Sequence, residues 1–288
     1  MKGVIIAAGY GTRFLPTTKT IPKEMLPIID IPTIEFTVRE FVDSGIRDIL
    51  IVSSRRKKAI EDYFDREIEL ENVFIKENAT EKLDKLKSAE NLANLHFIRQ
   101  QEMKGTAHAI HLARTFVGDE PFIVAYPDDF FAGNPPVAKQ LVDAYEKSGK
   151  NVLSAFEVPQ GNVSRYGIIA PGKALPELPN VFEVQGLVEK PAPENSPSNF
   201  AALGRYLFLP EVFPLFEETF KKTKISEAYQ TDAIHELASK GRVVAVAIIG
   251  ERFDTGTPLG YLKTLVRFAL ARADLQEEFQ VFLREILS

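Results

Sequence analysis

A loop with two glycines and several basic residues, near the start of the chain, has the composition of a phosphate-binding turn. The apolar run from Gly3 to Ala8 is too short for a stable helix and predicts a buried strand. Gly9 and Gly11 follow it, so the backbone leaves the strand by a tight turn whose N–H groups can converge on an anion. The chain carries a net charge of −5, yet four basic residues stand in its first 27 positions: Lys2, Arg13, Lys19 and Lys23. The stretch therefore predicts a site for a polyphosphate.

Two well-known phosphate loops do not fit this turn. The dinucleotide fingerprint needs a third glycine where this chain has Phe14, and the Walker pattern occurs nowhere in the sequence. The chain has instead G-x-G-T-R-x-x-P, followed by P-K-E-M-L-P at residues 22–27. These two motifs in register resemble the signature of the sugar-1-phosphate nucleotidylyltransferase family, and their spacing is most similar to that of its bacterial UTP–glucose-1-phosphate uridylyltransferases. A glycine-rich surface turn with solvated lysines is the alternative reading.

The resemblance implies a nucleotidyl transfer in which UTP and α-D-glucose 1-phosphate give UDP-glucose and pyrophosphate. It implies that Arg13 and Lys23 hold the leaving β- and γ-phosphates of the nucleotide. The other nucleotide-binding positions that it implies in this loop are Ala8, Gly9, Gly11 and Thr12.

A second nucleotide-binding segment follows the predicted strand at residues 96–100. An R-Q pair, five residues and then a glycine resemble the base-recognition loop of the same family, which implies that Gln100 and Gly105 contact the pyrimidine. An amide suits this task because it offers both a donor and an acceptor. His108 and His111 lie three apart on the following helix. With no third ligand candidate nearby, they are expected to be surface or packing histidines rather than metal ligands.

Two aspartates follow predicted buried strands, Asp128 after residues 121–126 and Asp254 after residues 243–249. Acids placed there lie at the ligand-binding edge of a doubly wound sheet, so their carboxylates can converge. The resemblance assigns both to one Mg²⁺, an ion that prefers oxygen ligands. The adjacent Asp129 has no assigned role. A turn with a helix N-cap is the alternative for residues 127–129, although Asn134-Pro135-Pro136 is a better helix start.

The sugar-binding positions are implied by short motifs that occur in family order. Gly167 would present a backbone N–H to a sugar hydroxyl, Glu189 would accept from two vicinal hydroxyls, and Lys190 would orient the sugar phosphate as a catalytic cation. Asn199 completes the implied set. A Glu-Lys pair before proline is common at strand ends, so it carries weight only beside its neighbours. Tyr229-Gln230 stands where the family pattern has Gln-Leu, and its role is open.

Alternating strands and helices are expected to position these residues. The first part of the chain alternates β-α-β-α, which predicts a parallel, doubly wound sheet. Shorter strands after Asn151 predict an antiparallel extension at the sugar site, so the fold class is α/β with a Rossmann-like doubly wound mixed sheet. Residues 1–265 would form the nucleotidyltransferase domain, with a nucleotide-binding part at about 1–150 and a sugar-binding part at about 151–265. The predicted strands span residues 3–8, 48–53, 96–100, 121–126, 152–158, 167–170, 181–188, 202–209 and 243–249.

Two further segments have no assigned chemistry. Residues 65–94 are rich in charge and predict an exposed helical excursion. Residues 266–288 predict a C-terminal helical tail with an apolar stripe, which could cap the core or meet a second subunit. The stripe consists of Leu275, Phe279, Phe282, Leu283 and Ile286.

The composition limits the location and partners of the protein. Of the 288 residues, 45% are hydrophobic and 26% are charged, as in ordinary globular proteins, and the absence of cysteine excludes disulfides and thiolate metal sites. The net negative charge argues against a nucleic-acid partner. No apolar stretch approaches about 18 residues and the first strand is no signal peptide, so the expected location is the cytoplasm. The expected partners are UTP, a sugar 1-phosphate and further copies of the chain in a dimer or tetramer.

Three alternative functions remain. A thymidylyl- or cytidylyltransferase on the same fold is the nearest, and nucleotide preference separates it from a uridylyltransferase. A non-catalytic sugar-nucleotide-binding regulatory protein would bind without releasing pyrophosphate, but the presence of both aspartates and both loop cations argues against it. A dinucleotide oxidoreductase is disfavoured by Phe14.

Overall fold

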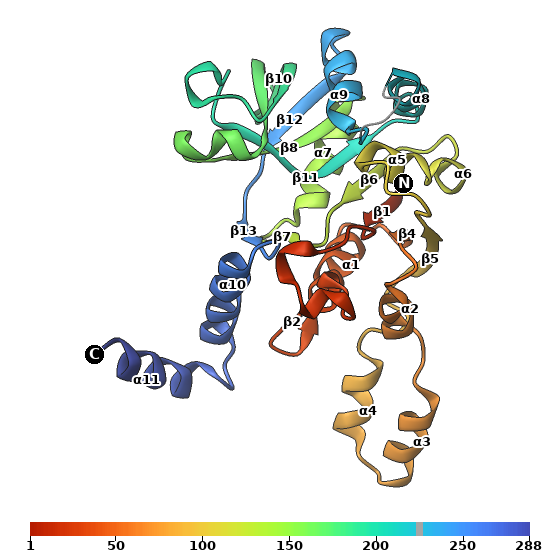
Figure 1. Cartoon of the computed structure of the whole chain (residues 1–288), viewed down its shortest axis with the longest axis vertical. Helices are drawn as coiled ribbons and strands as arrows, with labels where there is room; N and C mark the ends of the chain where they lie inside the picture. Colours follow the sequence, from red (N-terminus) through yellow and green to blue (C-terminus); the bar gives the residue numbers. More distant parts are fainter. Residues whose placement is uncertain (223–226) are drawn as a thin grey trace.

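The central element is a mixed sheet of nine strands, counted within residues 1–222 and 227–288, which the computed structural model describes (Figure 1). The strands lie in an order that differs from their order in the sequence, as expected where helices connect neighbouring strands. In sheet order they are β5 (Asn94–Arg99), β4 (Asp48–Ser53), β1 (Lys2–Ile6), β6 (Phe122–Ala125), β11 (Phe200–Phe208), β8 (Asn151–Glu157), β12 (Val243–Ala247), β10 (Leu178–Glu189) and β9 (Gly167–Leu175).

The first four strands of this order are parallel to one another, which confirms the predicted doubly wound half of the sheet. Strand β1 lies inside this half, between β4 and β6, and is buried on both faces. Val4 and Ile6 belong to the hydrophobic cluster on one face, while Ile5 belongs to the cluster on the other. A short apolar run is typical of a strand that is covered on both sides. The carboxyl end of β1 therefore opens at the centre of one sheet edge.

The remaining strands continue the same sheet. Strand β11 is antiparallel to β6 on one side and to β8 on the other, whereas β12 is parallel to β8. Strand β10 pairs antiparallel with both β12 and β9. The antiparallel extension was predicted, and the structure shows that it is continuous with the parallel half. The predicted boundary near residue 150 falls at the start of β8, inside the sheet.

Helices cover both faces of the sheet (Figure 1). Residues of α1 and α7 pack in one hydrophobic cluster, and residues of α5, α8 and α9 pack in the other. Apolar residues at helical spacing place one face of α1 in the first of these clusters, and α5 begins directly after Gly105. The helices that cover the sheet or connect its strands are α1 (Thr33–Asp43), α2 (Lys58–Phe64), α5 (Thr106–His111), α6 (Arg114–Val117), α7 (Val137–Ser148), α8 (Val212–Lys222) and α9 (Gln230–Ser239).

Two small antiparallel ribbons accompany the main sheet. Strands β2 (Pro27–Ile28) and β3 (Ile31–Pro32) form one, and β7 (Asp129–Ala132) and β13 (Glu251–Asp254) form the other. The second ribbon was not predicted, and it corrects the expected position of Asp254. Strand β12 ends at Ala247, and Asp254 lies instead at the end of β13, directly opposite Asp129. The ribbon, rather than the end of a central strand, brings this carboxylate to the sheet edge.

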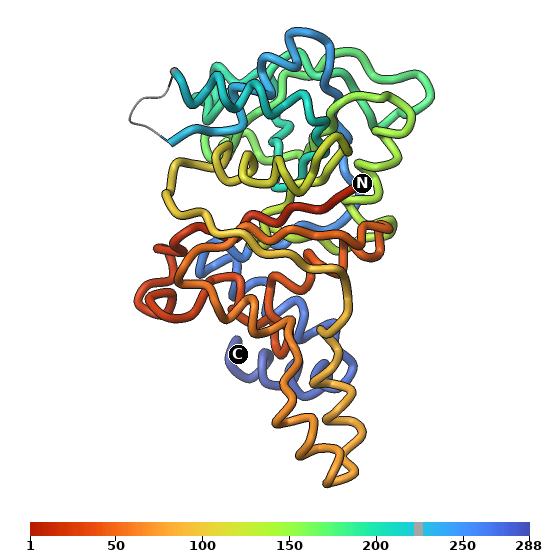
Figure 2. The backbone as a smooth tube through the Cα atoms, turned by 90° about the vertical axis from the view of Figure 1, so that its right-hand side faces the viewer, coloured from red at the N-terminus to blue at the C-terminus, as the bar shows by residue number. Residues whose placement is uncertain are grey.

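Two helical segments lie outside the sheet and its covering helices. Helices α3 (Ile68–Lys76) and α4 (Thr80–Lys87) form a hairpin that projects from one end of the molecule (Figure 2), which confirms the predicted excursion. Helices α10 (Pro258–Ala271) and α11 (Gln276–Leu287) form the C-terminal segment (Figure 1). In the part of the chain that the structure describes, no helix combines the length and apolarity that a membrane span requires.

Candidate active site

The glycine turn that follows β1 has the backbone geometry that the sequence suggested. Gly11 adopts a left-handed conformation with φ of +69°, and its carbonyl accepts a 2.7 Å hydrogen bond from the hydroxyl of Thr18. A side chain at this position would be strained and would press against Thr18 and Lys23. Gly9 has open space around it, and Ala8 is buried at the strand end. The turn therefore leaves an uncovered backbone at the carboxyl edge of the sheet.

A first cavity of about 360 Å³ lies against this turn. It brings together the loop at the end of β1, the short 3-10 turn Lys23–Met25, and the segment between β5 and α5. Six of the predicted nucleotide-binding positions line it, together with Lys23 and Asp128. The six are Ala8, Gly9, Gly11, Thr12, Gln100 and Gly105.

Gln100 and Gly105 meet at the far side of the first cavity. The amide nitrogen of Gln100 donates to the Gly105 carbonyl at 3.2 Å and lies 3.0 Å from Nδ1 of His108. Burial lowers the pKa of His108, so this ring is neutral at pH 7 and its Nδ1 can accept from the amide. With its nitrogen held in this way, the buried Gln100 side chain offers its carbonyl oxygen to a ligand. His111 packs its ring edge-on against Phe220.

The structure gives a packing reason for the glycine at position 105. Gly105 has φ of +91°, and a Cβ there would lie 2.3 Å from the carbonyl oxygen of Ala228. The amide of Ala107 donates to that same oxygen, and the amide of Ala228 donates to the carbonyl of Lys104. The segment before α9 therefore lies directly on the turn that begins α5, and only glycine permits this approach.

Lys23 and Asp128 form an ion pair in the first cavity, with 2.5 Å between Nζ and Oδ2. Burial opposes the charged form of Lys23, but the carboxylates of Asp128 and Glu24 raise its pKa above the ordinary value. Burial likewise acts to raise the pKa of Asp128, and the Lys23 ammonium reverses this and lowers it. Both groups are therefore charged at neutral pH.

A second cavity of about 630 Å³ adjoins the first. Its lining includes several predicted residues, which are Arg13, Asp128, Gly167, Glu189, Lys190 and Asp254. Arg13 lies in this cavity and not in the first, and its guanidinium donates to the Gly256 carbonyl at 3.2 Å. Asn199 lines neither cavity; its carbonyl accepts a hydrogen bond from the amide of Val158.

Glu189 and Lys190 form the more open wall of the second cavity. Gly167 stands opposite Glu189 in the pairing of β9 with β10, and a Cβ on Gly167 would lie 3.2 Å from the Glu189 carboxylate. Glu189 also accepts a hydrogen bond from Thr231 and lies 3.3 Å from the ammonium of Lys190. The backbone of Lys190 is left-handed, with φ of +45°, and its side chain is 59% exposed. These two charged groups are thus presented to solvent.

The carboxylates of Asp128 and Asp254 approach one another, as the sequence predicted. A Cβ placed on Gly256 would lie 3.0 Å from Oδ2 of Asp128 and 3.2 Å from Oδ1 of Asp254, so the two oxygens border the same small volume. Thr255 fixes this arrangement, because its amide and its hydroxyl both donate to the Asp128 carbonyl. The amide of Gly256 donates to the Asp254 carboxylate at 3.0 Å.

This donor set fits a hard divalent cation that also binds the substrate. Among the described residues, no group of three or more His, Cys, Asp or Glu side chains could hold a metal ion. Mg²⁺ usually takes one or two carboxylates and completes its shell with water and substrate phosphates. Two converging carboxylates in the lining of the second cavity are therefore compatible with Mg²⁺.

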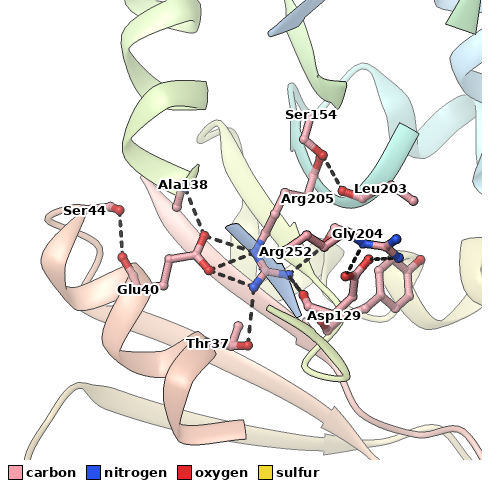
Figure 3. A network of polar contacts seen from close by, with 11 residues as sticks. Thr37, Glu40, Ser44, Asp129, Ala138, Ser154, Leu203, Gly204, Arg205 and Arg252 are labelled. Atoms are coloured by element: carbon pink, nitrogen blue, oxygen red, sulfur yellow. Dashed lines mark hydrogen bonds and ion pairs between the residues drawn. The ribbon is translucent and has the colours of Figure 1, made fainter. Parts of the chain in front are cut away.

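A buried arginine holds the loop that carries Asp128 (Figure 3). Arg205 is completely buried, and its guanidinium pairs with Glu40 on α1 at 2.8 Å. The same guanidinium donates to the carbonyls of Tyr126 and Asp129, which flank the Asp128 loop on either side. The role of Arg205 was not predicted from the sequence. Its burial depends on Glu40, which lies 165 positions earlier and which no local pattern marks.

Asp129 forms its ion pair with Arg252, whereas Asp128 pairs with Lys23. The Arg252 guanidinium binds both oxygens of Asp129, at 2.7 and 3.0 Å (Figure 3). It also lies 5.3 Å from the centre of the Tyr166 ring. Since Arg252 stands two residues before Asp254 on β13, this pair fastens β13 to β7. Asp129 therefore positions the ribbon, which answers the question that the sequence left open.

Four polar side chains form a neutral cluster where the two cavities meet. Thr106 and Tyr126 line both cavities, as does Asp128, whereas Tyr206 and Gln230 line the second. The Thr106 hydroxyl donates to Gln230, whose amide nitrogen lies 3.5 Å from the Tyr206 hydroxyl. Sequence reasoning missed Thr106 and Tyr126. Tyr229, by contrast, is turned away and donates its hydroxyl to Glu227.

Comparison with known families agrees with this geometry. Residues 2–269 match the model of the nucleotidyl transferase family. The chain is 44% identical to UTP–glucose-1-phosphate uridylyltransferase of Bacillus subtilis strain 168, covering 100% of this chain and 97% of the relative. It is 42% identical to the enzyme of the same name from Staphylococcus epidermidis, covering 99% of this chain and 98% of the relative. The family resemblance noted in the sequence is confirmed.

Solved structures of similar proteins share the fold. A UTP-bound UDP-glucose pyrophosphorylase from Acinetobacter baumannii superposes with a TM-score of 0.90 at 34% identity, covering 99% of this chain and 98% of the other. A UDP-glucose pyrophosphorylase complexed with UDP-glucose gives a TM-score of 0.81 at 38% identity, covering 94% of this chain and 99% of the other. The predicted α/β fold with a mixed sheet is therefore confirmed.

Proposed function

The chain belongs to the nucleotidyl transferase family, and from this membership we propose that it transfers a uridylyl group from UTP to α-D-glucose 1-phosphate. The products would be UDP-glucose and pyrophosphate. The relatives named UTP–glucose-1-phosphate uridylyltransferase match over the full chain, and two solved neighbours hold UTP or UDP-glucose.

The observation that carries the proposal is the shared wall between the two cavities. Asp128, Thr106 and Tyr126 line both, so groups bound on the two sides would meet beside the Asp128 carboxylate. Transfer of a nucleotidyl group needs such a junction, because an oxygen of one phosphate must reach the phosphorus of another. Cations stand on both sides of this junction, with Lys23 in the first cavity and Arg13 and Lys190 in the second.

In the first cavity the nucleotide would be held by its two ends. The backbone of Gly9 and Gly11 and the ammonium of Lys23 would bind the phosphates, while the Gln100 carbonyl would accept the imide N–H of uracil. Lys23 now pairs with Asp128, so it must exchange that carboxylate for a phosphate oxygen as UTP binds. Arg13 would meet the phosphates from the side of the second cavity.

In the second cavity the sugar phosphate would be aligned for in-line attack. Glu189 would accept hydrogen bonds from vicinal hydroxyls, with the Gly167 backbone beside it, and Lys190 would bind the phosphate. We propose Asn199, which directly precedes β11 and lies outside the lining of both cavities, as a further sugar contact. One phosphate oxygen of the sugar would bond to the α-phosphorus as the bond from that phosphorus to the bridging oxygen breaks. No general base is required, since the attacking oxygen is already an anion.

We propose that Asp128 and Asp254 hold Mg²⁺, whose charge would offset the repulsion between the two phosphates. The protein's own task at this point is to keep both carboxylates ionised and close together. The Lys23 ammonium lowers the pKa of Asp128, and the Gly256 amide binds Asp254. Because UTP is a cytoplasmic metabolite, we place the reaction in the cytoplasm.

A pyrophosphate-release screen tests the proposal. UTP, dTTP, CTP, ATP and GTP are each combined with several sugar 1-phosphates, in the presence of Mg²⁺ and with chelator as a control. UTP with glucose 1-phosphate is expected to give the highest kcat/KM. Binding of UTP without pyrophosphate release in any combination would point to a regulatory protein instead, and preference for dTTP or CTP would reassign the nucleotide.

We also propose that the C-terminal segment joins copies of the chain into a dimer or tetramer. Helix α11 has no buried residue, and four of its apolar side chains are exposed: Val281, Phe282, Ile286 and Leu287. Exposed apolar side chains gathered on one helix favour an interaction surface. Light scattering after size-exclusion chromatography should give a multiple of the 32.2 kDa chain mass, and Phe282→Asp should shift it toward the monomer.

A further inference from the structure

A second buried ion pair lies behind the nucleotide cavity. Glu24 and Lys57 are 0% and 4% exposed, and the Lys57 ammonium lies 2.7 Å from each oxygen of the Glu24 carboxylate. Burial works against both charges, since it raises the pKa of Glu24 and lowers that of Lys57. A buried ion pair is often no more stable than apolar residues of the same volume, so stability alone does not explain this one.

Glu24 is the neighbour of Lys23 in the turn that faces the phosphates. Lys23 to Met25 form one 3-10 turn, and both Lys23 and Glu24 line the first cavity, whereas Lys57 does not. The Glu24 carbonyl accepts a 2.9 Å hydrogen bond from the hydroxyl of Thr33, at the start of α1. The backbone of the turn is thereby fixed without help from the Glu24 side chain.

Two carboxylates could therefore compete for the cation of the first cavity. The charge of Glu24 acts on Lys23 in the same direction as the charge of Asp128. A carboxylate held against Lys23 inside the protein would have to be displaced before Lys23 could bind a phosphate. Lys57 prevents this competition, because it occupies both oxygens of Glu24.

We infer that Lys57 is a positioning residue for UTP: by holding the Glu24 carboxylate, it leaves the Lys23 ammonium free to pass from Asp128 to the phosphates of the nucleotide. This inference rests on the proposed function, in which UTP occupies the first cavity. It assigns a role to a residue that lines neither cavity and whose ammonium contacts Glu24, a residue that does line the first. The role depends on charge, so removal of one member of the pair is not equivalent to removal of the other.

Three variants test this asymmetry: Lys57→Met, Glu24→Gln and the double variant. Lys57→Met leaves the buried carboxylate without its cation, and Lys23 is the remaining cation whose charge acts on it. We expect the KM for UTP to rise about tenfold or more, with less than a twofold change in the KM for glucose 1-phosphate. Glu24→Gln removes the competing carboxylate, and the double variant removes both charges. Both should keep the KM for UTP within about threefold of the parent.

Binding of UTP in chelator, measured by calorimetry, gives a readout that does not depend on turnover. The dissociation constant should rise in Lys57→Met and recover in the double variant. Arg39→Met is the matched control, because Arg39 pairs at 2.6 Å with Glu35, a carboxylate that is 1% exposed and lies outside both cavities. It should lower the melting temperature and leave the KM for UTP unchanged.

The outcomes separate this inference from the proposed function. If the parent protein neither binds UTP nor releases pyrophosphate from it, the proposed function fails. If the parent is active but Glu24→Gln weakens UTP as much as Lys57→Met, the pair only fixes the turn and the inference is wrong. Should Lys57→Met fail to fold, the double variant and Glu24→Gln still decide the matter, because a tenfold rise in their KM for UTP would overturn the inference.

Discussion

The two cavities differ in how their charged groups are held. In the first cavity, Lys23 is 20% exposed and paired with Asp128, and the Gln100 side chain is buried and bonded at its nitrogen. In the second, Lys190 is 59% and Glu189 44% exposed, and their 3.3 Å contact lies in solvent. Exposed pairs of this kind contribute little to stability. The charged groups of the first cavity are thus held by buried contacts, whereas Glu189 and Lys190 in the second face solvent.

The difference follows from where each cavity lies on the sheet. The first opens beyond the carboxyl end of β1, a strand covered on both faces by hydrophobic clusters. The second opens between the end of β10 and the small ribbon of β7 and β13. Asp128 belongs to both cavities, and Arg205 holds its loop from inside the protein. The shared carboxylate is therefore rigid, although one of the two sites that it serves is open.

The largest loss of turnover is expected from substitutions of the two aspartates where the cavities meet. Asp128→Asn and Asp254→Asn each keep the shape of the side chain but remove one negative charge from the proposed Mg²⁺ site. Turnover should fall by about 100-fold or more in each, because an electrostatic contact to the reacting phosphates is lost. The double variant should cost much less than the two single effects combined, since both carboxylates serve one ion. The measurement is kcat across a Mg²⁺ titration.

Melting temperature is the control for folding in these variants. Asp129→Asn is a matched comparison, because Asp129 pairs with Arg252 and should affect the ribbon more than the ion. Near-normal turnover in either Asp128→Asn or Asp254→Asn would contradict the proposed mechanism, as would activity that persists in excess chelator.

Lys23→Ala and Lys190→Ala test the roles of the two cavities separately. Each removes a charge-assisted contact, so transition-state stabilisation should fall by about 1.5–3 kcal/mol, with the larger loss at the less exposed Lys23. Loss of Lys23 should mainly weaken the use of UTP, and loss of Lys190 mainly the use of glucose 1-phosphate. Steady-state kinetics with each substrate varied in turn would show this. Equal impairment of the same substrate by both variants would refute the division of the site.

Nucleotide preference tests the base contact that we propose for Gln100 in the first cavity. The Gln100 carbonyl can accept the imide N–H of uracil, whereas cytosine presents an acceptor at the same position. The unmatched edge should cost CTP about 1–3 kcal/mol in kcat/KM relative to UTP. Thymine differs from uracil only by a methyl group, so dTTP is the competitor that Gln100 cannot reject. Competition assays with the three nucleotides would settle the order, and faster turnover with CTP would exclude this base contact.

Local patterns in the sequence predicted the parts of this site that depend on local geometry. The strand at β1, the tight turn at Gly9 and Gly11, and the helix that follows Gly105 depend on short-range sterics. The pairing of Arg205 with Glu40 and of Lys57 with Glu24 could not be predicted, because a buried ion pair joins residues far apart in the chain. The ribbon of β7 and β13 was missed for the same reason, and with it the support of Asp254.

The smallest effect concerns Tyr126, whose hydroxyl lies between the two cavities. Burial raises the pKa of this phenol, so it stays neutral, and its oxygen has no hydrogen-bond partner among the residues that the structure describes. Thr106 and Gln230 are close by but are bonded to each other. An unpaired buried hydroxyl costs free energy, so Tyr126→Phe should leave stability unchanged or increase it by about 1 kcal/mol.

Tyr206→Phe is the matched control, because it removes the partner of Gln230 and should decrease stability. Thermal melts of both variants, with and without UTP and glucose 1-phosphate, distinguish the two cases. If Tyr126→Phe lowers the melting temperature only when a substrate is present, the hydroxyl binds that substrate. The wall between the two cavities would then recognise a substrate as well as separate the two binding sites.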